Sequence, residues 1–587
     1  MASLNHVIGS KCSVQVSLAL NLSDIVIGVF LFLATSCFVL WQNAHITILY
    51  DLSYNLENAT RISLGQIPYR DFPFPYAPLP FLVQASIIKL FGRVVLYHYA
   101  YAAVSSALAT LLTWRIVLRL LVSSRMPPRL TSFLLAVPLI PLGTCSIYPH
   151  QGYDADCTLF ILLCIWLLLR VESADFPAFG TFACGFMLAV PFLAKQNTGG
   201  AFLFAAVICI VFFGLRNRRA SVLLITGVTT GLACGLALIQ YIAGVSNYLR
   251  WTIHFAASRR LPGLRVMLGI YWHPALLWII VVIAFCIAYF LIRPAARPST
   301  LWFASGFLCV PFLWAAAAFS SHTYVADRLA AFLRIWPLLL ITSLAVALWQ
   351  LSGATRLGQL ISLILLGTVN GALLSQQVGG STYALWPILV ILIAAILVAL
   401  SPNERQFPRC NDSQFSTVPL IVFAGVASTV LLVIGSYYAL SHTRLEFADL
   451  SGDGLMHSSL PALRGLAMRG RWVSQFEELV AYADRDIPIG DAILMLPDED
   501  VFYFTTGRTP RFPVLVMDTT ANPYGPVQIA QLVRQCNVRW VVAKRKLQIY
   551  NEQVPSSFYP ELMNLLYHDF ELTKSLENYD IYRRRQE

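Results

Sequence analysis

Asp51 is the residue whose type and position best suit a chemical role. It directly follows the first long apolar run and opens a polar, aromatic and proline-rich stretch, residues 51–89. A polar stretch that follows an apolar run of about 20 residues lies outside the lipid, so Asp51 is predicted at the water–lipid boundary. A carboxylate there can accept the proton of an attacking hydroxyl group. The alternative is a solvated or helix-capping aspartate.

The spacing after Asp51 predicts a short helix that lies flat on the membrane. Asp51, Ala59, Arg61 and Gly65 recur at roughly helical intervals, and a glycine commonly ends a helix. The chain beyond Gly65 is predicted to be extended because it contains prolines, namely Pro68, Pro73, Pro75 and Pro78. This helix is expected to hold Asp51 at the exit of the first membrane span.

A second carboxylate, Asp71, lies in the same loop within the run Tyr69-Arg70-Asp71-Phe72. Asp71 is the second acidic candidate if Asp51 is only structural. The alternative for this run is a structural clamp, in which Arg70 and Asp71 pair and the aromatic rings rest at the membrane interface. The residue types alone leave both interpretations open.

The aspartate, the short helix, Gly65 and the run from Pro68 to Phe72 together resemble the first external loop of the GT-C glycosyltransferases. The most similar members would be the protein O-mannosyltransferases and the lipid A aminoarabinose transferases. The resemblance implies that Asp51 is the catalytic base and that the donor is a polyprenyl-phosphate-linked sugar. It also implies inverting transfer to a lipid, glycan or protein acceptor. Mannosyltransferases of this group usually have an acidic residue after the aspartate, whereas this chain has Leu52.

The run from Tyr148 to Asp156 contributes an imidazole and two carboxylates, His150, Asp154 and Asp156, to the next outer connection. Asp154-Ala155-Asp156 has the form of the DxD motif of soluble sugar-nucleotide transferases, but here it opens a membrane span instead of following a strand. GT-C enzymes often carry an acidic residue at this connection. One of the two aspartates is therefore expected to contact acceptor or sugar, and N-capping of the following helix is the alternative.

Cationic residues on the predicted outer face suggest an anionic ligand, because the positive-inside rule would place them on the other side. Lys195 with Gln196, and Arg259 with Arg260 and Arg265, are predicted to hold the phosphate of the lipid donor as it leaves. Contact with lipid headgroups is the alternative for each of them.

The composition is that of a polytopic membrane protein. Of its 587 residues, 57% are hydrophobic and 12% are charged, and the mean hydropathy is +0.66, whereas soluble domains have about 25% charged residues. The N-terminus lacks the pattern of a removable signal peptide. The twelve cysteines lack zinc-site spacing, so no cofactor is predicted and a divalent metal is not indicated.

Apolar windows of about 20 residues predict about thirteen spans. The windows are 25–45, 95–121, 130–147, 156–170, 176–194, 198–215, 220–243, 268–292, 299–318, 329–350, 357–374, 384–401 and 418–440. Arginines such as Arg125, Arg129 and Arg170 gather at the connections on one side, which the positive-inside rule makes cytoplasmic. The N-terminus is then cytoplasmic, and the Asp51 loop and everything after residue 440 are external.

Charged residues become frequent after residue 440, which predicts a separate α/β domain over 441–587. Helical spacing at 475–485 and 525–536 alternates with strand-like segments at 491–497 and 538–544. These segments lack a glycine-rich phosphate loop. The remaining chain, 1–440, is predicted to be a GT-C-like transmembrane domain with a catalytic external loop at 46–93.

We therefore predict an integral plasma-membrane glycosyltransferase, in which the substrate-contacting residues would be Arg61, Tyr69, Arg70, Asp71, His150, Asp154, Asp156, Lys195, Gln196, Arg259 and Arg260. Its partners would be the lipid donor, an acceptor and membrane lipids, without nucleic acid. A transporter or lipid flippase, which would require ionisable groups at mid-membrane, and a non-catalytic scaffold for the external domain are the alternatives.

Overall fold

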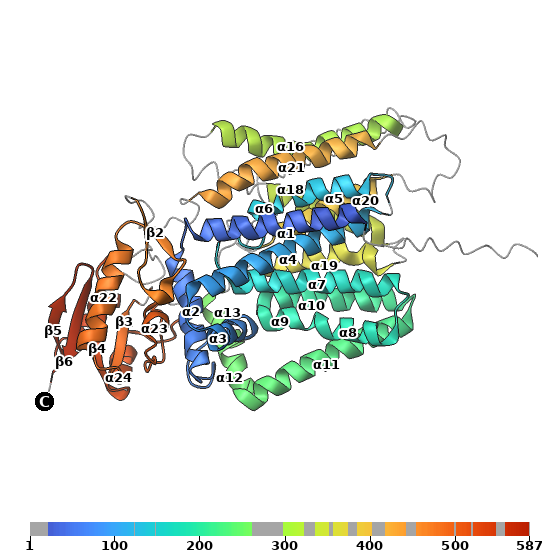
Figure 1. Ribbon diagram of the computed structural model, residues 1–587. Coiled ribbons are helices and arrows are strands. Elements are labelled where there is room, and N and C mark those ends of the chain that lie inside the picture. Colours follow the sequence, from blue (N-terminus) through green and yellow to red (C-terminus); the bar gives the residue numbers. More distant parts are fainter. Residues whose placement is uncertain are drawn as a thin grey trace, which may run out of the picture.

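The computed structural model describes residues 21–122, 124–146, 148–260, 297–321, 335–351, 356–373, 384–401, 417–441, 454–497, 500–517, 521–546 and 558–585. Helices dominate the chain up to residue 441, and they run side by side as a bundle (Figure 1). The chain from residue 454 onward, called here the C-terminal part, lies at one end of this bundle and contains the strands (Figure 1).

The bundle is built from pairs of apolar helices that pack lengthwise. The strongest pairings join α1 to α4, α8 to α11, α10 to α19 and α16 to α21. The helices are α1 (Leu22–Asn43), α4 (Val95–Leu121), α5 (Pro128–Ala136), α6 (Leu139–Leu142), α7 (Tyr153–Ser173), α8 (Ala178–Leu188), α9 (Val190–Ala194), α10 (Gln196–Gly214), α11 (Arg218–Ile242), α16 (Arg297–Ser321), α18 (Ile335–Leu351), α19 (Ile361–Leu373), α20 (Trp386–Leu400) and α21 (Val418–Leu440), with the 3₁₀ turn η4 (Leu357–Leu360) before α19.

Six helices among the described residues are long and apolar enough to cross a membrane, which makes this a multi-pass membrane protein. They lie in α1, α4, α10, α11, α16 and α21. Shorter apolar helices occupy several of the other predicted windows. The window 268–292 lies outside the described residues, so the number thirteen stays a prediction.

The predicted span at 130–147 is not one continuous helix. It is divided into α5 and α6, with Pro138 at the start of the second helix. Proline lacks the N–H that a helix interior needs, and its ring clashes with the preceding turn. The apolar composition alone did not show this break.

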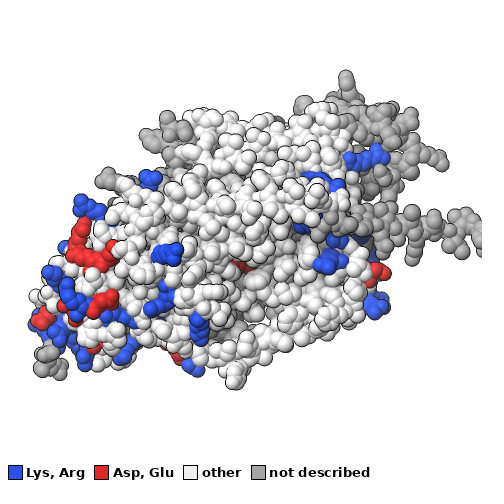
Figure 2. All heavy atoms as spheres, viewed as in Figure 1, with Lys and Arg blue, Asp and Glu red and all other residues white. Residues whose placement is uncertain are grey.

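Charged side chains gather at the two ends of the molecule and leave an almost uncharged belt between them (Figure 2). At one end, Arg129 forms an ion pair with Asp24 of α1, with 2.8 Å between Nε and Oδ1. Glu172, at the end of α7, accepts hydrogen bonds from the backbone N–H groups of Leu357 and Gly358. The belt is the face that a bilayer would cover.

Two short helices, α2 (Leu49–Ser63) and α3 (Leu79–Phe91), lie between the bundle and the C-terminal part (Figure 1). The prediction of a short helix that begins near Asp51 is confirmed. The helix ends at Ser63, and Gly65 follows with a φ of +95°, a conformation that glycine adopts without steric cost. In Figure 1, α2 runs across the direction of the bundle helices.

The C-terminal part contains a four-stranded sheet in the order β3-β4-β6-β5. Its strands β3 (Ala492–Leu496) and β4 (Val538–Lys544) are parallel, whereas β6 (Tyr579–Arg584) is antiparallel to both β4 and β5 (Phe570–Ser575). The remaining elements are α22 (Trp472–Asp486), α23 (Phe502–Thr506), α24 (Pro526–Gln535), α25 (Phe558–Leu566) and the small pair β1 (Leu455–His457) and β2 (Ala467–Arg469). The two helices and two strands predicted after residue 440 are confirmed, each within a few residues.

The C-terminal part packs directly on α2. Leu49, Leu52 and Leu56 of α2 are fully buried, and they share one apolar cluster with Phe476 of α22 and Phe502 of α23. Burial of apolar surface stabilises the folded state by about 25 cal/mol for each Å² removed from water. The helix that begins next to Asp51 is therefore part of a continuous core that reaches into the C-terminal part.

Candidate active site around Asp51

Asp51 lies in the first turn of α2 and is half-buried. The helix dipole favours a negatively charged group in the first turn of a helix. One turn further on, the Asn55 side chain donates a hydrogen bond of 2.8 Å to the Asp51 carbonyl oxygen. The same Asn55 amide lies 3.4 Å from the carbonyl oxygen of Gln151. This amide therefore joins the start of α2 to the run that contains His150.

Three buried polar residues on one face of α2, Ser53, Glu57 and Arg61, connect the helix to the C-terminal part, and we call them the polar stripe. Ser53 donates to the carbonyl oxygen of Asp500 at 2.8 Å. Glu57 accepts the N–H of Phe504 at 3.1 Å, and Arg61 donates to the carbonyl oxygen of Pro513 at 2.9 Å. Residues four apart lie on one face of a helix, so the stripe fixes how α2 is rotated.

Burial, with a smaller contribution from the nearby Asp500, raises the pKa of Glu57 to about 8, although the backbone N–H groups of Phe504 and Tyr503 act to lower it. Asp500 itself accepts hydrogen bonds from Trp472, Lys544 and Tyr579. Glu57 therefore carries a proton at neutral pH, and it acts as a structural contact rather than as a base.

Arg61, predicted to contact substrate, is only 2% exposed. Its guanidinium donates to Gln66 Oε1 at 2.5 Å and lies 4.1 Å from the ring centroid of Phe72, in addition to its bond to Pro513. These contacts give Arg61 a structural role in holding α2. A contact with substrate would require that the guanidinium leave them.

The run Tyr69-Arg70-Asp71 forms a clamp, as the structural alternative predicted. Arg70 pairs with Asp71 at 2.8 Å, and Asp71 Oδ2 accepts the N–H of Ile67. The hydrogen bond from Arg70 lowers the pKa of Asp71. Tyr69 is buried, and its hydroxyl group donates to the carbonyl oxygen of Tyr76. Asp71 is therefore ionised but already paired.

Lys195 and Asp154 form an ion pair with each other. Both side chains are largely buried, at 9% and 15% exposed, and the Lys195 ammonium lies 5.4 Å from the ring centroid of Tyr153. The sequence analysis placed both residues on the outer face, but it predicted that Lys195 binds a phosphate and that Asp154 or Asp156 contacts the acceptor or the sugar. In this structure each neutralises the other, so either predicted contact requires the pair to open.

Asp156 faces into the bundle and not toward Lys195. It is 2% exposed and accepts a hydrogen bond of 2.8 Å from the hydroxyl group of Tyr101 in α4. This contact anchors the first turn of α7 to the start of α4. Of the two aspartates in the DxD-like run, Asp154 is the more exposed one.

His150 and Gln196 connect further stretches at the same end of the bundle. His150 is buried, its Nδ1 lies 2.8 Å from the carbonyl oxygen of Gln151, and burial lowers its pKa to about 4. Its ring is therefore neutral at pH 7. Gln196 donates to the carbonyl oxygen of Pro75 at 3.0 Å, which joins the start of α10 to the first loop. The structure thus brings α2, the 148–156 run and Lys195–Gln196 together.

Arg259 is exposed on α13 (Ala256–Arg260), within a helical segment that continues from α12 (Val245–Leu249) and η1 (Arg250–Phe255). Arg260 ends this helix, and its side chain, like all of Arg265, lies outside the described residues. The segment is joined to the first loop by Tyr248, whose ring packs edge-on against Tyr69 with 5.2 Å between ring centroids.

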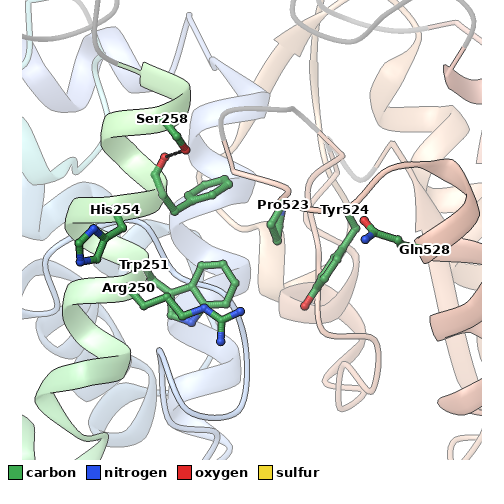
Figure 3. Close-up of a pocket in the computed structure, with 8 residues that line it drawn as sticks. Arg250, Trp251, His254, Ser258, Pro523, Tyr524 and Gln528 are labelled. Carbon is green, nitrogen blue, oxygen red and sulfur yellow. Dashed lines mark hydrogen bonds between the residues drawn. The ribbon is translucent and has the colours of Figure 1, made fainter.

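A cavity of about 440 Å³ lies between this segment and the C-terminal part, and we call it the interface cleft (Figure 3). It is lined by Arg250, Trp251, His254, Phe255, Ser258, Pro523, Tyr524 and Gln528. The sequence analysis did not select this set. The recurrence of Arg250, His254 and Ser258 every four residues was a signal, but Tyr524 and Gln528 lie more than 260 positions away.

The described residues contain no group of three or more His, Cys, Asp or Glu side chains that could hold a metal ion. Of the described cysteines, most are buried in the helix bundle and none forms a disulfide.

No protein-family model and no curated protein matches this chain. Among solved structures, it is similar to ArnT from Cupriavidus metallidurans bound to undecaprenyl phosphate. The two are 12% identical, the match covers 95% of this chain and 97% of that one, and the TM-score is 0.41. It is also similar to the oligosaccharyltransferase AglB from Archaeoglobus fulgidus, in complex with an inhibitory peptide and a dolichol-phosphate. These two are 12% identical, with coverages of 89% and 69% and a TM-score of 0.48.

Proposed function

We propose that this chain is a membrane glycosyltransferase that moves a sugar from a polyprenyl-phosphate-linked donor to an acceptor on the outer face of the membrane. The observation that carries the proposal is the position of Asp51. A half-buried carboxylate opens α2 at the end of an apolar helix bundle. Polar residues from the 148–156 run and from the start of α10 join the same end of the bundle.

Asp51 would act as the general base. It would take the proton of the acceptor hydroxyl group while that oxygen forms a bond to the anomeric carbon of the sugar. The bond from the anomeric carbon to the phosphate oxygen would break on the opposite side, and the electron pair would leave with the polyprenyl phosphate. This displacement inverts the anomeric configuration.

The leaving phosphate requires cationic partners that stabilise its charge. Arg259 is exposed in the described structure, and Arg260 is its neighbour on the same helix. We assign the phosphate to this pair. Lys195 is a further candidate, and for it the phosphate would replace the carboxylate of Asp154 as the ionic partner.

The proposal is tested with the purified full-length protein in lipid nanodiscs and a panel of polyprenyl-phosphate sugars. Consumption of one donor, with release of an equal amount of polyprenyl phosphate and a product of inverted anomeric configuration, is the expected result. The same protein in sealed vesicles should leave the donor lipid in its original leaflet. Movement of intact donor across the vesicle membrane without its consumption would contradict the proposal and favour a flippase.

A further inference from the structure

The interface cleft has two walls that come from distant parts of the sequence. Arg250, Trp251, Phe255 and Ser258 lie on the segment formed by η1 and α13. In the C-terminal part, Pro523 and Tyr524 lie just before α24 and Gln528 lies in its first turn. Figure 3 shows Tyr524 on the side opposite Trp251 and Arg250, whereas His254 points away from Tyr524. The cleft is thus an aromatic slot with a cation at its edge.

Both walls are fixed to the loop that carries Asp51. One wall continues from α12, whose Tyr248 is fully buried and packs against Tyr69. The other wall follows the segment 500–513, which the polar stripe of α2 binds. Each wall is therefore anchored to the loop that carries Asp51.

The wall formed by η1 is a π-helix of six residues, Arg250–Phe255. Such segments are rare and occur frequently at functional sites. Within this π-helix, the guanidinium carbon of Arg250 lies 5.0 Å from the ring centroid of Trp251. An arginine beside an indole keeps its charge available at the mouth of the cleft while its side chain is held in one orientation.

The lining combines aromatic rings with a few polar groups, which is typical of sites for organic ligands. Trp251, Phe255 and Tyr524 offer ring faces, Gln528 offers an amide that both donates and accepts, and Arg250 offers a positive charge. The C–H faces of sugar rings stack on aromatic rings, and sugar hydroxyl groups pair with amides. A carboxylate or phosphate on the sugar would pair with Arg250.

We propose that the interface cleft binds a saccharide with an anionic substituent and that this saccharide is the acceptor. The assignment as acceptor rests on the proposed function, whereas the binding itself does not. The volume of about 440 Å³ falls in the range of about 300–1,000 Å³ that is usual for such sites. An isoprenoid chain would require a continuous apolar groove, and the polar groups of this cleft do not provide one.

The test uses the full-length protein in nanodiscs, without donor, and measures binding by isothermal titration. The probes are a tetrasaccharide that ends in glucuronic acid and the matched tetrasaccharide that ends in glucose. We expect the acidic probe to bind about tenfold or more tightly than the neutral one, because one charge-assisted pair contributes at least that factor. Absence of saturable binding of both probes would overturn the proposal.

Substitutions at three residues separate the features of the cleft. Arg250→Gln should remove the preference for the acidic probe and leave the affinity for the neutral probe within about threefold. Trp251→Ala and Tyr524→Ala should weaken both probes by about tenfold, the scale of a lost stacking contact. Trp251→Phe and Tyr524→Phe retain a ring and should keep most of the affinity, so they distinguish stacking from a folding defect.

The matched control is Gln531→Ala, because Gln531 is exposed on α24 but does not line the cleft, whereas Gln528 does. Gln528→Ala should weaken binding and Gln531→Ala should not. Equal affinity of all cleft variants and the wild type would overturn the proposal. So would a loss of undecaprenyl-phosphate binding in Arg250→Gln with saccharide binding unchanged, because the cleft would then belong to the lipid. Saccharide binding without any glycosyl transfer would instead contradict the proposed function.

Discussion

Two of the regions in which the C-terminal part meets the rest of the chain differ in how their polar groups are used. At α2 the region is closed: the stripe residues Ser53, Glu57 and Arg61 bind backbone groups of the C-terminal part directly. At the segment formed by η1 and α13 the region is open, and Arg250 and Gln528 face a cavity. The same two parts can therefore pack closely, and the cavity marks where they do not.

The difference separates residues that position the site from residues available to a ligand. Polar groups that are buried and bonded within the protein contribute to a unique arrangement, and removal of one partner leaves the other unsatisfied. Exposed cations such as Arg259 carry no such structural cost. Substitutions in the closed region should therefore reduce stability, and those in the open region should reduce binding.

The largest loss of stability is expected from Lys195→Met, because it leaves the largely buried Asp154 without its ionic partner. Breaking one side of a buried ion pair costs about 3–5 kcal/mol. The double variant with Asp154→Asn should recover most of this loss, as measured by thermal unfolding in detergent. If Lys195→Met unfolds like the wild type but binds donor weakly, the pair is not structural, and Lys195 belongs to the phosphate site.

A smaller loss is expected from Arg61→Ala, which leaves the carbonyl oxygen of Pro513 and the Gln66 side chain without their donor. An unsatisfied buried partner costs about 1–3 kcal/mol. Limited proteolysis should then digest the variant more readily than the wild type. If Arg61→Ala had unchanged stability but lost donor binding, Arg61 would contact substrate, as the sequence predicted, and its structural role would be contradicted.

Arg259→Ala combined with Arg260→Ala tests the open region. Thermal unfolding should be unchanged, while donor affinity should fall by about tenfold or more, because charge-assisted hydrogen bonds to the phosphate are lost. Titration with the polyprenyl-phosphate sugar that the wild type consumes provides the measurement. Wild-type affinity in this double variant would place the phosphate elsewhere, with Lys195 as the next candidate.

The effect of pH sharpens the comparison further, because Glu57 belongs to the closed region. Its pKa is about 8 in the folded protein against an ordinary value of 4.5, so the folded state binds a proton that the unfolded state has lost. This stabilising contribution is complete below about pH 4.5 and disappears as the pH rises toward about 8.

Glu57→Gln keeps an acceptor for the N–H of Phe504 but cannot ionise. The variant should therefore lose the decline in melting temperature between about pH 5 and pH 8 that the wild type shows. Melting curves over this range decide the point. If the melting temperature of the wild type changed with pH in the same way as that of Glu57→Gln, this result would contradict a buried, protonated Glu57.

Local patterns in the sequence predicted the elements but not their long-range contacts. The windows 95–121 and 418–440 coincide with α4 and α21, because an uninterrupted apolar run and its polar flanks determine both ends. The start of the Asp51 helix was similarly visible in residue spacing. The break between α5 and α6 was missed because the span was predicted from its apolar composition, without regard to Pro138 within it.

The polar stripe and the Lys195–Asp154 pair could not be predicted, since each requires a partner that sequence spacing does not reveal. Ser53 binds a residue 447 positions away. Asp154 and Lys195 were expected on one face, but nothing in the sequence showed that the connections before α7 and α10 bring them into contact. Local spacing thus predicted the candidate base, whereas the contacts that hold its helix in place are seen only in the tertiary structure.

The central claim is that Asp51 is the general base, and Asp51→Asn tests it most directly, because asparagine keeps the size and most hydrogen bonds of aspartate but cannot accept a proton at neutral pH. In the purified protein, donor affinity should stay at the wild-type level while turnover falls by about 10²–10⁴-fold. Asp71→Asn, measured beside it, removes a carboxylate that is already paired with Arg70. Turnover of Asp51→Asn within about threefold of the wild type would contradict the account, and a loss confined to Asp71→Asn would make Asp71 the base.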